Sequence, residues 1–284
     1  MFSVRSLCPL VPHQNNSEAR KADRIIFFYL LPIRKKVAFD NLDLCFPEKD
    51  IRWKKNIVKQ SYINLGINLT EFLYLPKLNR KLLNNFINFE NHELVTEGKR
   101  KNKGIFILSG HYSNWELMAY AYAKVFDDPL SIIAKVQASR GLNDKINEYR
   151  KLAGNDIIEI GFSLKNIFKK LLSNETVCFL IDQSAHPDYS VYIDFFGMKV
   201  PAFSGPAKIA LRNRPELLIA NGVRNIDYSY TIKFEKVEYD DIQIEDENSV
   251  RLLTQRIQTM FEQVIRKDLG QWLWLHKRFK HRKK

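Results

Sequence analysis

The sequence predicts an α/β fold: a single domain with a mostly parallel central sheet flanked by helices, preceded by N-terminal helices. Three observations indicate this class. The chain has 284 residues, of which 45% are hydrophobic, so it can bury a sizeable core. Between residues 105 and 181, short apolar runs alternate with longer stretches at helical spacing, which is typical of βαβ units. Neither internal repeats nor low-complexity segments interrupt this pattern.

The individual elements follow from the spacing of the apolar residues along the chain. An amphipathic helix is expected over about 50–75 and a second helix over 79–86. The alternating region then predicts strand 105–108, helix 114–126, strand 130–136, helix 142–152, strand 156–160, helix 163–173 and strand 176–181. After residue 182 we expect a long loop, a helix near 204–213, strands 216–223 and 230–237 at the sheet edge, and a helix from about 248 to 267.

The charge balance favours an anionic partner. The net charge is +13, from 45 basic and 32 acidic residues. Nucleic acid, an anionic membrane surface and an acidic substrate all fit such a surplus, which does not choose among them. Three widely separated cysteines provide neither a disulfide framework nor a zinc motif.

An apolar run near the N-terminus is too short to cross a membrane as a helix. The run IIFFYLLPI (25–33) has nine residues, whereas a spanning helix needs roughly 20. Three basic residues (34–36) follow it at once. This pattern suits insertion into one leaflet, but it also suits a short segment buried beneath the domain.

The stretch GIFILSGHYSNWE (104–116) places a histidine where a buried strand is predicted to end. Ligands of open α/β sheets collect at the carboxyl ends of strands, and Gly110 before His111 permits a tight turn. In one interpretation Ser113 and Glu116 form a helix capping box and His111 is a loop residue. In the other, His111 is a general base and Glu116 fixes its tautomer. A single His with a single Glu does not form the helical zinc motif.

Several segments together resemble a known family. GHYSNWE (110–116) is similar to the H-x-x-x-x-[D/E] motif of glycerolipid acyltransferases, within the lysophospholipid acyltransferase superfamily. It resembles more narrowly the G-H-x-x-N-W-E form of the lipid A biosynthesis lauroyl/myristoyl acyltransferase family. Further similar segments follow in the family's order: NLDLCFPEKD (41–50), IDQ (181–183), DFFG (194–197), GPAKIAL (205–211) and QWLWLHKRFK (271–280).

The resemblance implies an enzyme that moves a fatty acyl chain from a thioester of acyl carrier protein or CoA to a hydroxyl. The acceptor would be a lipid A precursor or a related glycolipid or lysophospholipid. It further implies a glycerol-3-phosphate acyltransferase-like domain over 36–284, behind a polar and short apolar, membrane-proximal segment over 1–35. No metal and no bound cofactor are expected. The expected location is the cytoplasmic face of the bacterial inner membrane, with peripheral or monotopic attachment to an anionic surface.

Residue roles carry over from the resembling motifs. His111 would be the general base and Glu116 its partner. The expected substrate-binding residues are Arg150, Asp182, Gln183, Asn114 and Arg278. Among these, Asn114 equally suits holding the turn through its amide, and the Asp-Gln pair equally suits supporting its loop. The arginine in the C-terminal segment is expected to meet an anionic head group or the acidic carrier protein.

Three other functions are weighed against acyl transfer. A nucleic-acid-binding protein would explain the charge, but the sequence contains no helix-turn-helix, finger or RNA-binding signature. A serine esterase could use Ser109 with His111, although no G-x-S-x-G elbow is present and the two residues are awkwardly close. A family member that binds lipid without turnover is the third, and the intact pair of His111 and Glu116 argues against it.

Overall fold

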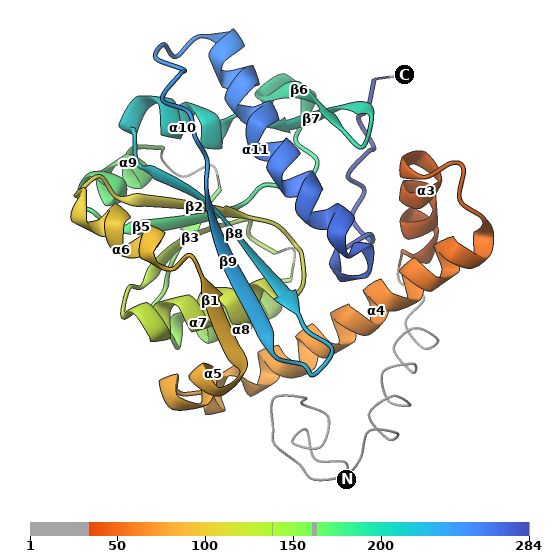
Figure 1. Ribbon diagram of the computed structural model, residues 1–284, viewed down its shortest axis with the longest axis horizontal. Helices are drawn as coiled ribbons and strands as arrows, with labels where there is room; N and C mark the ends of the chain where they lie inside the picture. The colour runs from red at the N-terminus through yellow and green to blue at the C-terminus, as the bar shows by residue number, and fades with distance from the viewer. Residues whose placement is uncertain (1–33, 138, 161–163, 284) are drawn as a thin grey trace.

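The computed structural model describes residues 34–137, 139–160 and 164–283 (Figure 1). The apolar run 25–33 lies outside these ranges. At the centre is a seven-stranded sheet in the order β1-β9-β8-β2-β5-β3-β4. Its strands are β1 (Ile87–Glu90), β2 (Ile105–Ser109), β3 (Leu130–Ala134), β4 (Asp156–Glu159), β5 (Thr176–Leu180), β8 (Glu216–Arg224) and β9 (Tyr230–Lys236). The predicted α/β fold with a mostly parallel sheet is confirmed.

The strand directions put β2 in the parallel interior of the sheet. It pairs in parallel with β5 on one side and β8 on the other. β8 and β9 are antiparallel, and β1 pairs in parallel with β9, so these two strands run against the rest. The prediction that 216–223 and 230–237 lie at the sheet edge is therefore wrong, because β8 and β9 are both interior and β1 forms the edge. Seven consecutive buried residues of β8 fit an interior strand, which is covered on both faces.

Helices cover both faces of the sheet. Alternate residues of β2 separate the two cores: Phe106 and Leu108 face one, and Ile105 and Ile107 face the other. The first core contains residues of α9 (Leu164–Leu172), α10 (Gly205–Asn213) and α11 (Glu247–Lys267). The second contains residues of α5 (Arg80–Phe86), α6 (Glu93–Arg100) and α7 (Trp115–Phe126), and Tyr149 of α8 (Arg140–Lys151) packs against it.

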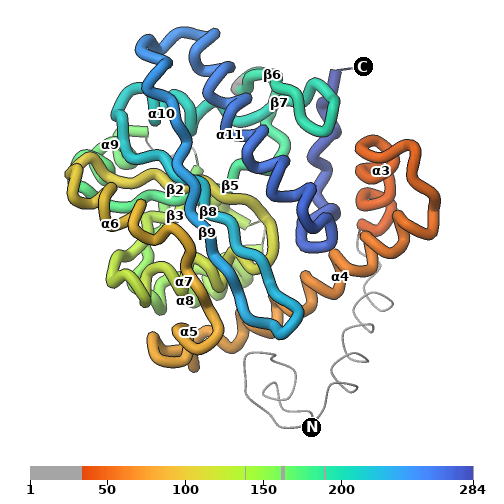
Figure 2. Tube along the Cα trace, in the orientation of Figure 1, coloured from red at the N-terminus to blue at the C-terminus, as the bar shows by residue number. Residues whose placement is uncertain are grey.

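Two further helices lie before α5 in the chain; the second matches the helix predicted over about 50–75, and the first was not predicted. They are α3 (Lys35–Cys45) and α4 (Ile51–Tyr74), and Figure 2 shows α4 running from α3 to the neighbourhood of α5. The helix α4 begins at Asp50, whose side chain accepts a hydrogen bond from Trp53 N–H at 2.7 Å. Among the described residues, no helix combines the length and the apolar character that a membrane span requires.

The long loop predicted after residue 182 is wrong in part, because it contains a β-hairpin. Strands β6 (Ser190–Phe195) and β7 (Met198–Phe203) pair antiparallel across Phe196 and Gly197. Both turn residues have positive φ, 51° and 75°, as two-residue hairpin turns of the primed type require. Sequence reasoning also missed β1 and α6. Three short 3-10 turns also occur in the described chain: η1 (Leu75–Lys77), η2 (Pro187–Tyr189) and η3 (Leu269–Gln271).

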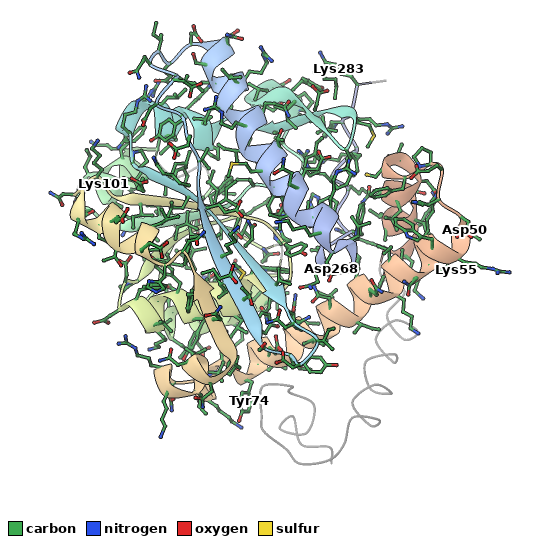
Figure 3. The ribbon with its side chains drawn as sticks, viewed as in Figure 1. Asp50, Lys55, Tyr74, Lys101, Asp268 and Lys283 are labelled. Carbon is green, nitrogen blue, oxygen red and sulfur yellow. The ribbon has the colours of Figure 1, made fainter. Side chains whose placement is uncertain are left out.

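Many of the basic side chains lie on the surface. Figure 3 shows Lys55, Lys101 and Lys283 on three different parts of the molecule, and all three are exposed. The excess positive charge is thus spread over the described surface.

Candidate active site

The predicted motif forms the turn between β2 and α7. β2 ends at Ser109 and α7 begins at Trp115, so residues 110–114 lie at the carboxyl edge of the sheet. The neighbouring strand β5 ends at the same edge, where Ile181 N–H donates to Ser109 O at 2.8 Å. This pairing brings residues 182 and 183 beside His111, as expected for side chains that follow adjacent parallel strands.

Gly110 is required because an aromatic ring approaches it closely. A Cβ atom at this position would lie 2.0 Å from Cζ of Phe261 in α11. Its φ is outside the left-handed region that other glycines of the chain occupy. The expected reason for the glycine, a tight turn, is therefore replaced by the need for space beside Phe261.

The predicted capping box is wrong. Asn114, not Ser113, caps α7, since its Oδ1 accepts a hydrogen bond from Leu117 N–H at 3.0 Å. Ser113 instead adopts the left-handed conformation, with φ of 53°. That conformation costs about 1–3 kcal/mol for a residue other than glycine, and it persists only where the surroundings hold it. The side chain of Glu116 points to another partner, described below.

His111 is paired with Asp182. Its Nδ1 lies 2.8 Å from Asp182 Oδ1, and its backbone N–H donates to Oδ2 at 2.8 Å. Trp272 Nε1–H donates to the same Oδ2 at 2.9 Å. Burial alone would raise the pKa of Asp182, but the positive charge of a protonated His111 and these N–H donors lower it to about 2. The expected contact between His111 and Glu116 is thus not made, because Asp182 occupies the Nδ1 side of the ring.

This arrangement defines the tautomer of a neutral His111. An ionised Asp182 can only accept, so Nδ1 carries the proton and Nε2 keeps its lone pair. Nε2 lies 3.3 Å from Gln183 Nε2, an amide nitrogen that can only donate. The ring is 16% exposed. A hydroxyl that displaced Gln183 would therefore meet an unprotonated ring nitrogen.

Glu116 forms an ion pair with Arg150 of α8. Its Oε1 lies 2.6 Å from Nη2 and its Oε2 lies 2.9 Å from Nε, a bidentate geometry. Burial would lower the pKa of Arg150, but the charge of Glu116 raises it. The pair is connected to His111 through Trp115. The indole Nε1–H donates to Glu116 Oε1 at 3.2 Å, and the ring contacts the imidazole edge-to-face at 4.8 Å.

Three of the predicted substrate-binding residues are buried, namely Asn114, Arg278 and Asp182, whose partners are given above. Asn114 is 1% exposed, and both ends of its amide are bonded within the protein, so it holds the turn. Arg278 is 0% exposed; its Nη1 donates to Pro201 O at 2.7 Å, and its guanidinium lies 5.0 Å above the Phe195 ring. Burial lowers the pKa of Arg278 to about 10, and Nε and Nη2 have no hydrogen-bond partner among the described residues, so its contact with an anionic head group or carrier protein stays a prediction.

Sequence reasoning missed the part played by the C-terminal segment. Leu273 N–H donates to His111 O at 3.0 Å, and Tyr112 forms an isolated antiparallel bridge with Trp272. The Trp272 indole then reaches Asp182, as described above. The family-like segment QWLWLHKRFK was the available signal, because its aromatic residues had no assigned role.

An apolar cavity of about 40 Å³ opens beside the turn, between the sheet and α7. Ser109, Trp115, Met118, Tyr122 and Cys178 are among the residues that line it. Burial raises the pKa of the Cys178 thiol to about 12, so this cysteine is a core residue rather than a nucleophile. Within the described residues, no group of three or more His, Cys, Asp or Glu side chains is arranged to hold a metal ion.

Comparison with known proteins shows similarity over nearly the whole chain. A family model for the bacterial lipid A biosynthesis acyltransferases matches residues 4–281. A lipid A biosynthesis palmitoleoyltransferase of Escherichia coli is 23% identical over 255 residues, covering 88% of this chain and 79% of that protein. A lipid A biosynthesis lauroyltransferase of the same organism is 22% identical over 254 residues, covering 88% and 80%. A lipid A biosynthesis acyltransferase of Haemophilus influenzae is 23% identical over 262 residues, covering 88% and 78%.

Proposed function

The chain belongs to the bacterial lipid A biosynthesis acyltransferase family, and from this premise we propose how its site transfers an acyl group. The protein is an O-acyltransferase. In the proposed reaction, a fatty acyl chain moves from a thioester of acyl carrier protein or CoA to a hydroxyl of a lipid A precursor or a related glycolipid or lysophospholipid. The observation that carries the proposal is the His111–Asp182 pair, which leaves Nε2 unprotonated at the carboxyl edge of the sheet.

His111 acts as the general base in this proposal. Nε2 takes the proton of the acceptor hydroxyl while the hydroxyl oxygen attacks the thioester carbonyl carbon. The tetrahedral intermediate then expels the thiolate, which takes the proton back from Nε2 as the ester forms. Asp182 holds the ring in the required tautomer and stabilises the imidazolium formed between the two steps. A positioned base of this kind contributes roughly 10²–10⁴-fold in rate.

Glu116 serves the site in a different way from the one expected, whereas Arg150 keeps its expected substrate-binding role. Because Glu116 holds Arg150 through two hydrogen bonds, the guanidinium is fixed at the mouth of the site beside Trp115. A fixed cation there suits a phosphate of the acceptor or of the thioester donor. The cavity beneath Trp115 is apolar, but its volume of about 40 Å³ leaves room for only a small part of an acyl chain.

The proposed setting is the cytoplasmic face of the bacterial inner membrane, with peripheral or monotopic attachment. The net charge of +13 supports attraction to an anionic membrane surface, at about 1 kcal/mol for each basic residue near the surface. The same charge supports encounter with an acidic donor protein.

The test uses the purified full chain and its His111→Ala variant. Each is incubated with radiolabelled acyl thioesters of acyl carrier protein or of CoA, and with a lipid A precursor or a lysophospholipid. A labelled lipid made by the wild type, and made at least 10²-fold more slowly by the variant, supports the proposal. Equal product from both proteins would exclude His111 as the base. The thioester and the lipid that react identify the donor and the acceptor.

The alternatives are not favoured. The family assignment makes a nucleic-acid-binding role unnecessary for explaining the charge. The side chain of Ser109 lines the apolar cavity and is 6% exposed, which disfavours it as an esterase nucleophile. Covalent labelling of Ser109 by a fluorophosphonate would revive the esterase hypothesis.

A further inference from the structure

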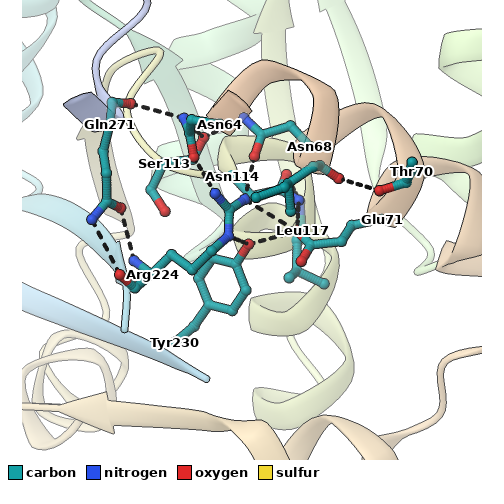
Figure 4. Close-up of polar contacts among 11 residues, drawn as sticks. Asn64, Asn68, Thr70, Glu71, Ser113, Asn114, Leu117, Arg224, Tyr230 and Gln271 are labelled. Atoms are coloured by element: carbon teal, nitrogen blue, oxygen red, sulfur yellow. Dashed lines mark hydrogen bonds and ion pairs between the residues drawn. The ribbon is translucent and has the colours of Figure 1, made fainter. Parts of the chain in front are cut away.

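A second polar cluster lies behind the His111 turn, and no step of the proposed reaction uses it (Figure 4). We call it the buried polar cluster. It joins helix α4, the start of α7, strands β8 and β9, and the turn η3. Its members are Asn64, Asn68, Glu71, Asn114, Arg224, Tyr230 and Gln271.

Glu71 is the centre of this cluster. It is 0% exposed, and its Oε2 accepts hydrogen bonds from Asn114 Nδ2 at 2.6 Å and from the Tyr230 hydroxyl at 2.5 Å. Arg224 Nη2 lies 3.3 Å from the same oxygen, and its side chain is 6% exposed. A buried carboxylate is costly unless a cation and hydrogen-bond donors surround it, so Glu71 and Arg224 depend on each other.

Arg224 orients two amides of α4 toward the turn. It donates to the side-chain oxygens of Asn64 and Asn68, at 2.5 Å for Asn68. A guanidinium can only donate, so each amide turns its oxygen to Arg224 and its NH₂ group away. Those NH₂ groups both donate to the backbone carbonyl of Ser113. The charge of Arg224 therefore polarises the hydrogen bonds that hold Ser113.

Ser113 and Asn114 are thus held from several sides. The Ser113 N–H donates to Gln271 O at 2.8 Å. The Gln271 side chain bonds both backbone groups of Arg224, at 2.8 and 3.1 Å. Asn114 uses its NH₂ group for Glu71 and its oxygen for the first turn of α7. Because Ser113 is left-handed, this convergence explains how the turn keeps its conformation.

We propose that Glu71 and Arg224 are positioning residues for acyl transfer, which act through Ser113 and Asn114 to hold the turn that places His111. The inference rests on the proposed role of His111 as the base. Both side chains are buried and bond to other members of the cluster rather than to His111. Their loss should therefore change the rate of the chemical step more than the binding of the thioester.

The experiment compares Glu71→Gln with Tyr230→Phe and a matched control. Glutamine keeps the size of Glu71 and one oxygen for its three donors, but it removes the charge. Tyr230→Phe removes one donor and leaves both charges. The control is Thr176→Val, which removes a fully buried hydroxyl and its bond of 2.6 Å to Asp128 at the opposite edge of the sheet. All variants are measured for kcat, KM for the thioester, and melting temperature.

We expect Glu71→Gln to lower kcat on the order of 10–100-fold with KM changed less than about threefold. Tyr230→Phe should lower kcat by about 3–10-fold, and Thr176→Val should leave it near wild type. If Glu71 acts only through His111, then Glu71→Gln should not lower the residual rate of His111→Ala any further.

Two results would overturn the inference. In the first, Glu71→Gln and Tyr230→Phe have the same kcat as Thr176→Val, while all three variants lose a similar amount of melting temperature. In the second, Glu71→Gln lowers the rate by the same factor in the wild type and in His111→Ala. If Glu71→Gln does not fold, Tyr230→Phe decides the first comparison. Equal turnover by wild type and His111→Ala would instead refute the proposed function, and no Glu71 variant is needed to see that failure.

Discussion

Replacing Asp182 with asparagine should nearly abolish acyl transfer while leaving the fold intact. The new amide would keep its oxygen toward the two N–H donors, His111 N and Trp272 Nε1, which lie 2.8 and 2.9 Å from Oδ2 of the native carboxylate. The amide NH₂ group would then face His111 Nδ1, where a carboxylate oxygen now lies at 2.8 Å. Nδ1 must accept in that geometry, so the ring proton moves to Nε2.

The size of the effect follows from this change of tautomer. With a proton on Nε2, the ring cannot take the hydroxyl proton, and Nε2–H also faces the Gln183 amide at 3.3 Å. The enzyme then loses the contribution of its general base, roughly 10²–10⁴-fold in kcat. This equals about 3–5 kcal/mol of transition-state stabilisation.

The assay is single-turnover transfer from a labelled thioester, with melting temperature measured alongside. Asp227→Asn is the matched control, because Asp227 lies in an exposed turn where it bonds Ser229. A kcat for Asp182→Asn within about threefold of wild type would refute the tautomer reasoning. A larger loss of kcat in Glu116→Gln than in Asp182→Asn would also refute it, because Glu116 would then be the residue that orients His111.

Three further outcomes are expected. Glu116→Gln weakens the bidentate pair with Arg150. Steady-state kinetics should then show about a tenfold rise in KM for the acceptor, with a smaller change in kcat. An unchanged KM would count against a role for this pair in binding. Gly110→Ala places a methyl group against the Phe261 ring, so the free energy of unfolding in urea should fall by about 1–3 kcal/mol. Adding Phe261→Leu should restore part of this free energy. An unchanged free energy of unfolding in Gly110→Ala would mean that the ring moves freely. The lowered pKa of Asp182, from 3.8 to about 2, contributes about 2 kcal/mol of stability above pH 4, and this is lost as the pH falls toward 2. The stability difference between wild type and Asp182→Asn should therefore narrow over that range in acid titrations, and a constant difference would contradict it.

The sequence was sufficient to predict the layers of the fold and the location of His111. Apolar runs of β2, β3, β4 and β5 alternate with helical stretches, and that period is a local property of the chain. The resemblance pointed to Asp182 and Gln183, and they lie beside His111 because the carboxyl ends of adjacent parallel strands meet. The hairpin β6–β7 was missed, because its pairing depends on a two-residue turn in which Phe196 has positive φ.

The choice of carboxylate for His111 could not be read from spacing. Glu116 is five positions away and Asp182 is 71, yet the distant residue makes the contact. The start of α7 determines which carboxylate contacts His111. Asn114 rather than Ser113 caps the helix, and Glu116 then points to Arg150. The roles of Glu71 and Arg224 depend on α4 crossing behind the turn, and that crossing is a tertiary contact without a local pattern.

The contacts of the C-terminal segment also determine when the His111 turn can be completed during translation. Residues 271–273 hold Ser113, His111 and Asp182, and they leave the ribosome after every strand of the sheet. A domain generally folds as a unit, so the His111 turn can be completed only after this last segment has emerged. A nascent chain that has exposed only the sheet therefore lacks three backbone and side-chain partners of the His111 turn and Asp182. If His111 is the base, as proposed, acyl transfer begins only after the segment around Trp272 has emerged and packed against the turn.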